Sequence, residues 1–290
     1  MKRRDLLKAA SATLGLSAFP LGWVAAAESK TKKVLYFTRS AGFEHSVVHR
    51  KDGQLAHSEK ILTEMGKAAG FDVECTQDGG VFDGNLDQYD AIAFFTSGNL
   101  ISPKGNGKPM SAAGKQRLLD AVHAGKGFIG FHACTDSFRP SPPPPAPVEP
   151  YLAMVGAEFV GHGAQQEVPL GIVSHFPGTA SLGSSDTVSF KDEWYAQKNF
   201  GKDLHVILVQ RTAKMEGGVY RRPDFPCTWA RLHGKGRVFY TSLGHREDIW
   251  TNPRFQSIAL GGIAWTLGNV AFDPVPNVDS VTPGANQLKS

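Results

Sequence analysis

The sequence is poor in cysteine, and its three cysteines, Cys75, Cys134 and Cys227, are far apart. They form no C-x-x-C pair, so a zinc finger or a thioredoxin-like motif has no basis. In an oxidising compartment two of them could form a disulfide, which would leave at least one free thiol. The chain also lacks G-x-S-x-G, and no glycine-rich loop leads from a strand into a helix, so we expect no nucleotide cofactor.

A strong excess of charge is also missing. The net charge is +4 over 290 residues, and residues 1–27 contribute +3 of it, which leaves +1 for the rest. A nearly neutral chain gives no support for a basic surface that binds nucleic acid, so we expect no nucleic-acid partner.

Residues 1–27 have the parts of an export signal. Arg3 and Arg4 begin a basic segment, an apolar run follows, and Ala25-Ala26-Ala27 offers a cleavage site. The paired arginines resemble a twin-arginine signal, which predicts a periplasmic protein. A retained membrane anchor is the alternative, but the run is short of the roughly 20 residues needed to span a bilayer. No second apolar run approaches that length, so we expect no stable membrane insertion after cleavage.

The remaining chain alternates apolar runs with amphipathic segments. Residues 32–38, 71–77, 91–97 and 128–133 read as strands, whereas 54–70 and 111–127 have helical spacing and end at glycine. This alternation predicts an α/β fold with a mostly parallel sheet and helices on both faces. Further strands are expected at 187–195, 205–211, 227–232 and 236–245, some of them antiparallel, before a helix over 253–269. We expect one domain over 33–270 and an extended or disordered tail over 271–290.

The stretch from Arg139 to Tyr151 is rich in proline and cannot be a helix. It predicts a stiff polyproline-type loop beside the ligand pocket, with a binding epitope for a partner as the alternative.

Polar side chains gather where the expected strands end. In open α/β sheets ligands bind at the carboxyl edge, so we expect one cleft there, reached by His162 and Gln166 from a loop. The residues that follow strands are His45, Asn99, His132, Glu193 and His245.

His132 ends an apolar strand, and Gly130 and Ala133 leave room for a tight turn that would raise its imidazole above the sheet edge, as a nucleophile elbow does. Asp136 could orient this imidazole or cap the next turn. Cys134, two residues on, is expected to turn away. A thiolate hydrolase that uses Cys134 stays as a lesser alternative.

The stretch KDEWY places an acid beside an aromatic ring. On a continuous strand Glu193 and Tyr195 share one face, while Asp192 and Trp194 share the other. A ring beside a carboxylate suits a sugar, whose C–H face packs on the ring while its hydroxyls bind the acid. The alternative is a charge at the sheet edge next to a packed aromatic.

Several motifs occur in order: GFxHSxV, TSGNL, GKGFIGFHACTDSF, YLAMVGAEFVGHG, DEWY and GKGRVFYTSLGHREDIW. Together with PRFQSIALGGIAWTLG they resemble the ThuA-like family of trehalose-utilisation proteins over residues 33–270. The resemblance implies a flavodoxin-like fold similar to class I glutamine amidotransferases, and carbohydrate as the substrate class. The residues that it implies at the site are His45, His132, Glu193 and His245, supported by Asn99, Asp136, His162, Gln166 and Tyr195.

These residues lead to a hypothesis of function. His45, His132, Glu193 and His245 would hold a divalent metal ion, Zn²⁺, Mn²⁺ or Fe²⁺, or shuttle protons. His132, Glu193, His245 and Asp136 would then catalyse isomerisation, elimination or hydrolysis of a sugar or 3-keto-glycoside by acid–base chemistry. A sugar-binding protein without turnover is the rival hypothesis. An oligomer is compatible with either.

Overall fold

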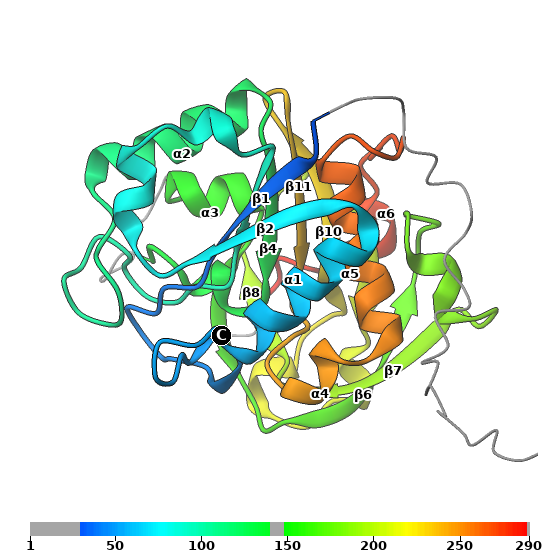
Figure 1. Ribbon diagram of the computed structural model, residues 1–290. Helices are drawn as coiled ribbons and strands as arrows, with labels where there is room; N and C mark the ends of the chain where they lie inside the picture. Colours follow the sequence, from blue (N-terminus) through cyan, green and yellow to red (C-terminus); the bar gives the residue numbers. More distant parts are fainter. Residues whose placement is uncertain (1–29, 140–147, 289–290) are drawn as a thin grey trace, which may run out of the picture.

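The computed structural model describes residues 30–139 and 148–288 (Figure 1). The expected export signal and most of the proline-rich stretch lie outside these residues. In the part of the chain that is described, no helix is long and apolar enough to cross a membrane.

A nine-stranded sheet in the order β2-β1-β3-β4-β11-β10-β9-β6-β7 forms the centre of the fold. Its first five strands pair in parallel. They are β2 (Phe71–Thr76), β1 (Lys32–Phe37), β3 (Ala91–Phe94), β4 (Gly127–Phe131) and β11 (Gly236–Thr241). All residues of β3 and β4 are buried, which explains why their sequences are uniformly apolar.

Antiparallel pairs continue the sheet beyond β11, as expected for the second half of the chain. The strands are β10 (Phe225–His233), β9 (His205–Gln210), β6 (Gln166–Ile172) and β7 (Thr187–Asp192). Because direction reverses at each pair, β7 points the same way as β11 and β4. Its carboxyl end therefore lies at the same edge of the sheet as theirs.

Helices cover both faces of the sheet, as predicted (Figure 1). One side carries α1 (His57–Ala69), α4 (Glu247–Trp250) and α5 (Pro253–Thr266), and the other carries α2 (Ala112–Ala124) and α3 (Pro150–Val155). The helix α1 begins later than expected because Glu59 accepts a hydrogen bond from the Ala56 backbone, and it ends at Gly70 in the left-handed conformation.

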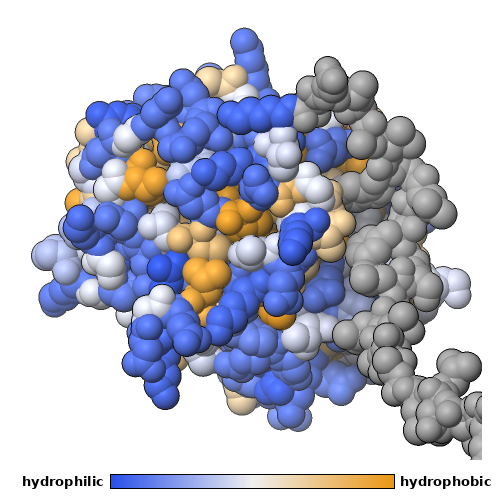
Figure 2. Space-filling model, in the orientation of Figure 1, coloured by the Kyte–Doolittle hydropathy of each residue, from blue (hydrophilic) through white to orange (hydrophobic). Residues whose placement is uncertain are grey.

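Smaller elements complete the fold. Strands β5 (Glu158–His162) and β8 (Tyr195–Lys198) form a separate antiparallel pair, in which His162 lies opposite Tyr195. Short 3₁₀ helices are η1 (Ser46–Val48), η2 (Gly79–Asp83), η3 (Leu86–Gln88), η4 (His132–Asp136), η5 (Thr179–Leu182), η6 (Thr212–Lys214) and η7 (Gly218–Tyr220). Hydrophilic residues cover most of the face in Figure 2, and apolar residues there form small separate patches.

The C-terminal segment differs from its prediction. Residues 271–277 have no regular structure, but the short helix α6 (Val278–Val281) follows. The Asn277 side chain accepts a hydrogen bond from the Val206 nitrogen at 2.6 Å and donates to its carbonyl oxygen at 3.1 Å. Val278 and Ala285 are buried. The described tail is therefore packed against β9, and the prediction of an extended or disordered tail was wrong there.

Candidate active site

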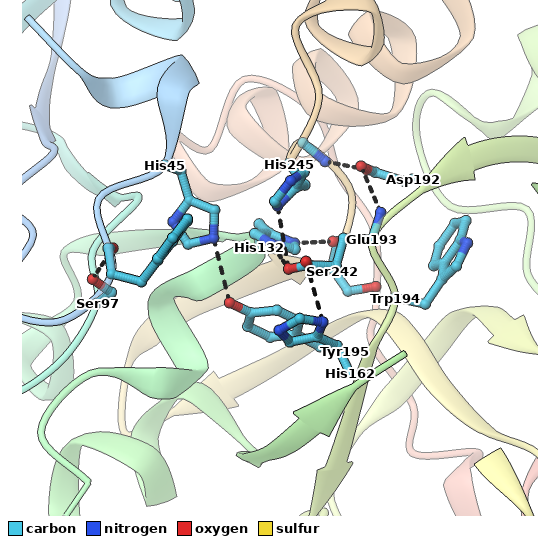
Figure 3. A network of polar contacts seen from close by, with 12 residues as sticks. His45, Ser97, His132, His162, Asp192, Glu193, Trp194, Tyr195, Ser242 and His245 are labelled. Atoms are coloured by element: carbon cyan, nitrogen blue, oxygen red, sulfur yellow. Dashed lines mark hydrogen bonds and ion pairs between the residues drawn. The ribbon is translucent and has the colours of Figure 1, made fainter. Parts of the chain in front are cut away.

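Four predicted site residues meet at the carboxyl edge of the sheet (Figure 3). One ligand atom from each of His45, His132, Glu193 and His245 lies within 4.8 Å of the others. Glu193 Oε2 is 3.5 Å from His132 Nε2 and 3.2 Å from His245 Nδ1. The sequence therefore located this cluster correctly, although its members are up to 200 positions apart along the chain (45 to 245).

His132 lies in a sharp turn directly after β4. Its φ of 39° lies in the left-handed region, which is unusual for a residue with a side chain and is common at functional sites. A Cβ on Gly130 would lie 2.4 Å from the sulfur of Cys134, so the turn requires glycine there. The hydroxyl of Tyr240 donates to the His132 carbonyl oxygen at 2.8 Å and holds the turn in place. The predicted elbow is confirmed.

The His132 imidazole has a defined tautomer. Its Nδ1 lies 2.8 Å from the carbonyl oxygen of Ser242, which can only accept, so Nδ1 carries a proton. In the neutral ring Nε2 then presents a lone pair toward the Glu193 carboxylate. Two acceptors that face each other need a cation or a second proton between them, and this arrangement is common for metal-binding histidines.

Asp192 fixes the loop that carries Glu193. Its carboxylate accepts from the Glu193 nitrogen at 2.9 Å and from the Gly244 nitrogen at 2.8 Å, next to His245. Strand β7 ends at Asp192 and β8 begins at Tyr195, so Glu193 and Trp194 lie outside both strands. Glu193 and Tyr195 both contact His132, as expected for two residues on one side. The prediction of one continuous strand was wrong, and the Asp192 carboxylate binds backbone next to His245.

The charge state of each residue in the cluster depends on its burial and on the charges of the other residues. Burial, then the imidazoles of His132 and His245, lowers the pKa of His45 to about 2. Burial alone raises the pKa of Glu193, but the imidazoles of His132 and His245 outweigh it and hold the pKa well below its ordinary value. Burial opposes the charge of His245, yet Glu193 raises its pKa overall. The cluster thus contains a carboxylate, a neutral imidazole and an imidazole that can hold a proton.

Aromatic rings form one wall of the site. Tyr195 packs on His132 with 4.2 Å between ring centroids and on Phe159 with 4.1 Å. The His162 ring stacks on Tyr195 with centroids 6.0 Å apart, and His162 Nδ1 is 3.2 Å from Glu193 Oε1. The His162 side chain is 44% exposed, so it links the buried carboxylate to solvent.

Three predicted residues do not join the cluster. The Asn99 side chain accepts from the Ile101 nitrogen and Asn99 is exposed. The Gln166 side chain binds the backbone of Glu216 through both its oxygen and its nitrogen. Asp136 pairs with the Arg139 guanidinium at 2.5 Å instead of orienting His132. Each position was near a strand end, but sequence does not fix the direction in which such a side chain points.

Cys134 does not reach the site. It is fully buried beneath the turn against Gly130, and burial raises the pKa of its thiol. All three cysteines are unpaired in the structure, so no disulfide forms among them. A nucleophile must be accessible and ionisable, and Cys134 is neither.

A hollow of about 610 Å³ lies at the opposite, amino-terminal edge of the parallel strands. Its cationic lining lies beside the carboxyl ends of α2 and α5, where positive charge offsets the helix dipole. Lys32 pairs with Asp90, Lys126 donates to the Tyr89 carbonyl oxygen, and Arg237 donates to the Trp265 carbonyl oxygen near the end of α5. The fourth cation of the lining is Lys235, and none of the lining residues belongs to the histidine cluster.

Comparison with known proteins identifies the family. A model of the ThuA family, described as trehalose utilisation, matches residues 33–266. The chain belongs to the ThuA family. Two solved ThuA-like structures are similar to this ThuA protein. The one from Parabacteroides merdae has 18% identity and a TM-score of 0.61, and it covers 84% of this chain and 93% of its own.

The other ThuA-like structure, from Bacteroides uniformis, has 16% identity and a TM-score of 0.57, with 83% of this chain and 94% of its own covered. A cytoplasmic protein from Salmonella typhimurium has 12% identity and a TM-score of 0.51, with 81% and 98% covered. At these identities the similarity shows the fold alone. No curated protein matches this ThuA protein.

Proposed function

We propose that this ThuA protein is an enzyme of carbohydrate metabolism that binds a divalent metal ion and acts on a sugar or 3-keto-glycoside by acid–base chemistry. The observation that carries the proposal is the cluster of three imidazoles and one carboxylate whose ligand atoms lie within 4.8 Å of one another. They are His45, His132, Glu193 and His245.

The unpaired atoms of the cluster fit a metal ion. Among the described residues, His132 Nε2 and His245 Nδ1 are buried nitrogens without a hydrogen bond, and both face Glu193 Oε2, at 3.5 and 3.2 Å. Unpaired buried polar atoms are costly, and a cation would satisfy both of them together. Imidazole nitrogens with one carboxylate suit Zn²⁺, Mn²⁺ or Fe²⁺ rather than Ca²⁺. The Ser242 carbonyl supports the proposal because it accepts from His132 Nδ1 and so orients the ring, as the partners of metal-binding histidines do.

The residues themselves supply the acid–base groups. A bound divalent ion would add Lewis-acid polarisation of a substrate carbonyl. Without a bound ion, Glu193 is a carboxylate because its pKa is lowered, and His245 holds a proton more readily because its pKa is raised, so the pair can pass a proton. With an ion bound, the same side chains serve as its ligands instead. His162 can exchange protons between Glu193 Oε1 and solvent. These roles suit isomerisation, elimination or hydrolysis next to a carbonyl.

Carbohydrate as the substrate class is supported by the family description and by the aromatic wall. His162, whose side chain is 44% exposed, and the half-buried Phe159 offer ring surface at this wall, whereas Tyr195 is buried between His132 and Phe159. A pyranose has both a C–H face and hydroxyls, which suits exposed rings beside a carboxylate. The same wall also favours the rival proposal, a sugar-binding protein without turnover. The strand order β2-β1-β3-β4-β11 supports a flavodoxin-like class, similar to class I glutamine amidotransferases.

We also propose export through residues 1–27 and a periplasmic mature protein, which N-terminal sequencing of protein from a periplasmic extract would test. The function itself is tested by turnover of a panel of 3-keto-glycosides with purified protein. We expect activity with at least one substrate and a loss of at least about 100-fold on His132→Ala, with an unchanged circular dichroism spectrum. Sugar binding without any turnover would establish the rival proposal instead.

A further inference from the structure

Phe43 is an exposed aromatic ring beside a buried histidine cluster. It is 66% exposed, whereas its neighbour His45 is 2% exposed. The two rings meet edge to face, with 4.9 Å between centroids. His45 in turn lies 5.0 Å from His132 and 5.2 Å from His245, again between ring centroids. Phe43 is thus the exposed end of a row of contacting rings that continues through His45 to His132 and His245.

The backbone that carries Phe43 is held rigidly. The Ser97 hydroxyl donates to the Phe43 carbonyl oxygen at 2.6 Å. The nitrogens of Ala41 and Gly42 both donate to the Ser97 carbonyl oxygen. A Cβ on Gly98 would lie 2.4 Å from the Gly42 nitrogen, so the two loops touch through bare backbone. An exposed ring on a fixed backbone is presented to a ligand with little loss of conformational entropy on binding.

We infer that Phe43 is a stacking platform that binds the C–H face of a pyranose ring at the mouth of the site. Apolar rings with a few convergent polar groups are typical of ligand pockets, and Phe43 supplies ring surface where Glu193, His162 and the other histidines supply polar groups. Phe43 precedes η1 whereas Phe159 lies on β5, so the two rings come from different elements. This inference rests on the proposed carbohydrate function.

Stacking can be distinguished from simple shielding of His45. Phe43→Ala removes the ring and opens His45 to water, Phe43→Leu keeps an apolar cover but removes the flat ring, and Phe43→Trp enlarges the ring. If Phe43 stacks on a sugar, the Ala and Leu variants both lose affinity and the Trp variant keeps it. If Phe43 only shields His45, the Leu variant behaves like the wild type.

The test is calorimetric titration of the protein as purified with trehalose, methyl glucoside and sorbitol, an acyclic polyol that has no ring face. We expect the two cyclic sugars to bind and sorbitol not to bind, with Phe43→Ala and Phe43→Leu each about tenfold weaker. Leu232→Ala is the control, because Leu232 is 48% exposed and lies on β10. Its affinity should equal that of the wild type.

Each outcome is decisive. Wild-type sugar affinity in Phe43→Ala or in Phe43→Leu overturns the platform and leaves the carbohydrate function intact. A wild-type protein that binds neither cyclic sugar overturns the platform, whereas the proposed function is decided separately by turnover of the 3-keto-glycoside panel.

Discussion

Asp192→Asn is predicted to weaken both the fold and the metal centre. The Asp192 carboxylate is fully buried and uses one oxygen for the Glu193 nitrogen and the other for the Gly244 nitrogen. The amide of asparagine places an NH₂ group against one of these two backbone donors. One charge-assisted hydrogen bond is lost and a buried donor is left unpaired, which costs about 2–3 kcal/mol of the free energy of unfolding.

The same substitution acts on the site because Asp192 ties the end of β7 to the loop of His245. Loss of a group that holds metal ligands in place typically reduces metal affinity about 10-fold to 100-fold. Urea denaturation measures the loss of stability, and calorimetric titration of chelator-treated protein with Zn²⁺ measures the loss of affinity. The matched control is Asp203→Asn, which breaks a pair with Arg231 at a carboxylate that is 48% exposed and should cost less than about 1 kcal/mol. Equal stability and equal zinc affinity in the two variants would refute the role assigned to Asp192.

Three further predictions concern the turn that carries His132 and the cysteine beneath it. Gly130→Ala should cost about 1–3 kcal/mol of unfolding free energy, since its Cβ would lie 2.4 Å from the Cys134 sulfur, and Cys134→Ala in the same chain should restore part of it in urea denaturation. No rescue would contradict this contact. Tyr240→Phe should cost about 1 kcal/mol and weaken Zn²⁺ binding in the same titration, because the His132 carbonyl loses its hydrogen bond. Unchanged zinc affinity would show that the turn keeps its conformation without the hydrogen bond from Tyr240. Cys134→Ser should retain turnover of the sugar substrate, and iodoacetamide should not alkylate Cys134 in the native protein. Loss of turnover in Cys134→Ser would instead support catalysis by the Cys134 thiol.

The cluster could be predicted from the sequence because it follows from a general property of parallel sheets. Parallel strands bring their carboxyl ends to one edge, so His132 and His245 had to lie near each other once β4 and β11 were recognised as strands. Glu193 was harder, because it depends on β7 pointing the same way after four antiparallel pairs.

Side-chain direction and breaks within strands were not predictable from spacing. Asn99 and Gln166 follow or begin strands, yet they bind nearby backbone instead of the cluster. The link from Asp192 to the loop of His245 was missed because KDEWY reads as one continuous strand, whereas the chain leaves β7 before Glu193. The tail carries too few apolar residues for a periodic signal, and it packs through the side chain of Asn277 instead.

The most direct measurement is elemental analysis of protein purified without a chelator and without an affinity tag, compared with His132→Ala prepared in the same way. The account predicts about one Zn, Mn or Fe ion per chain in the wild type and far less in the variant, with loss of activity on metal removal and its return on metal addition. A wild-type protein that is free of metal and fully active would contradict the metal centre.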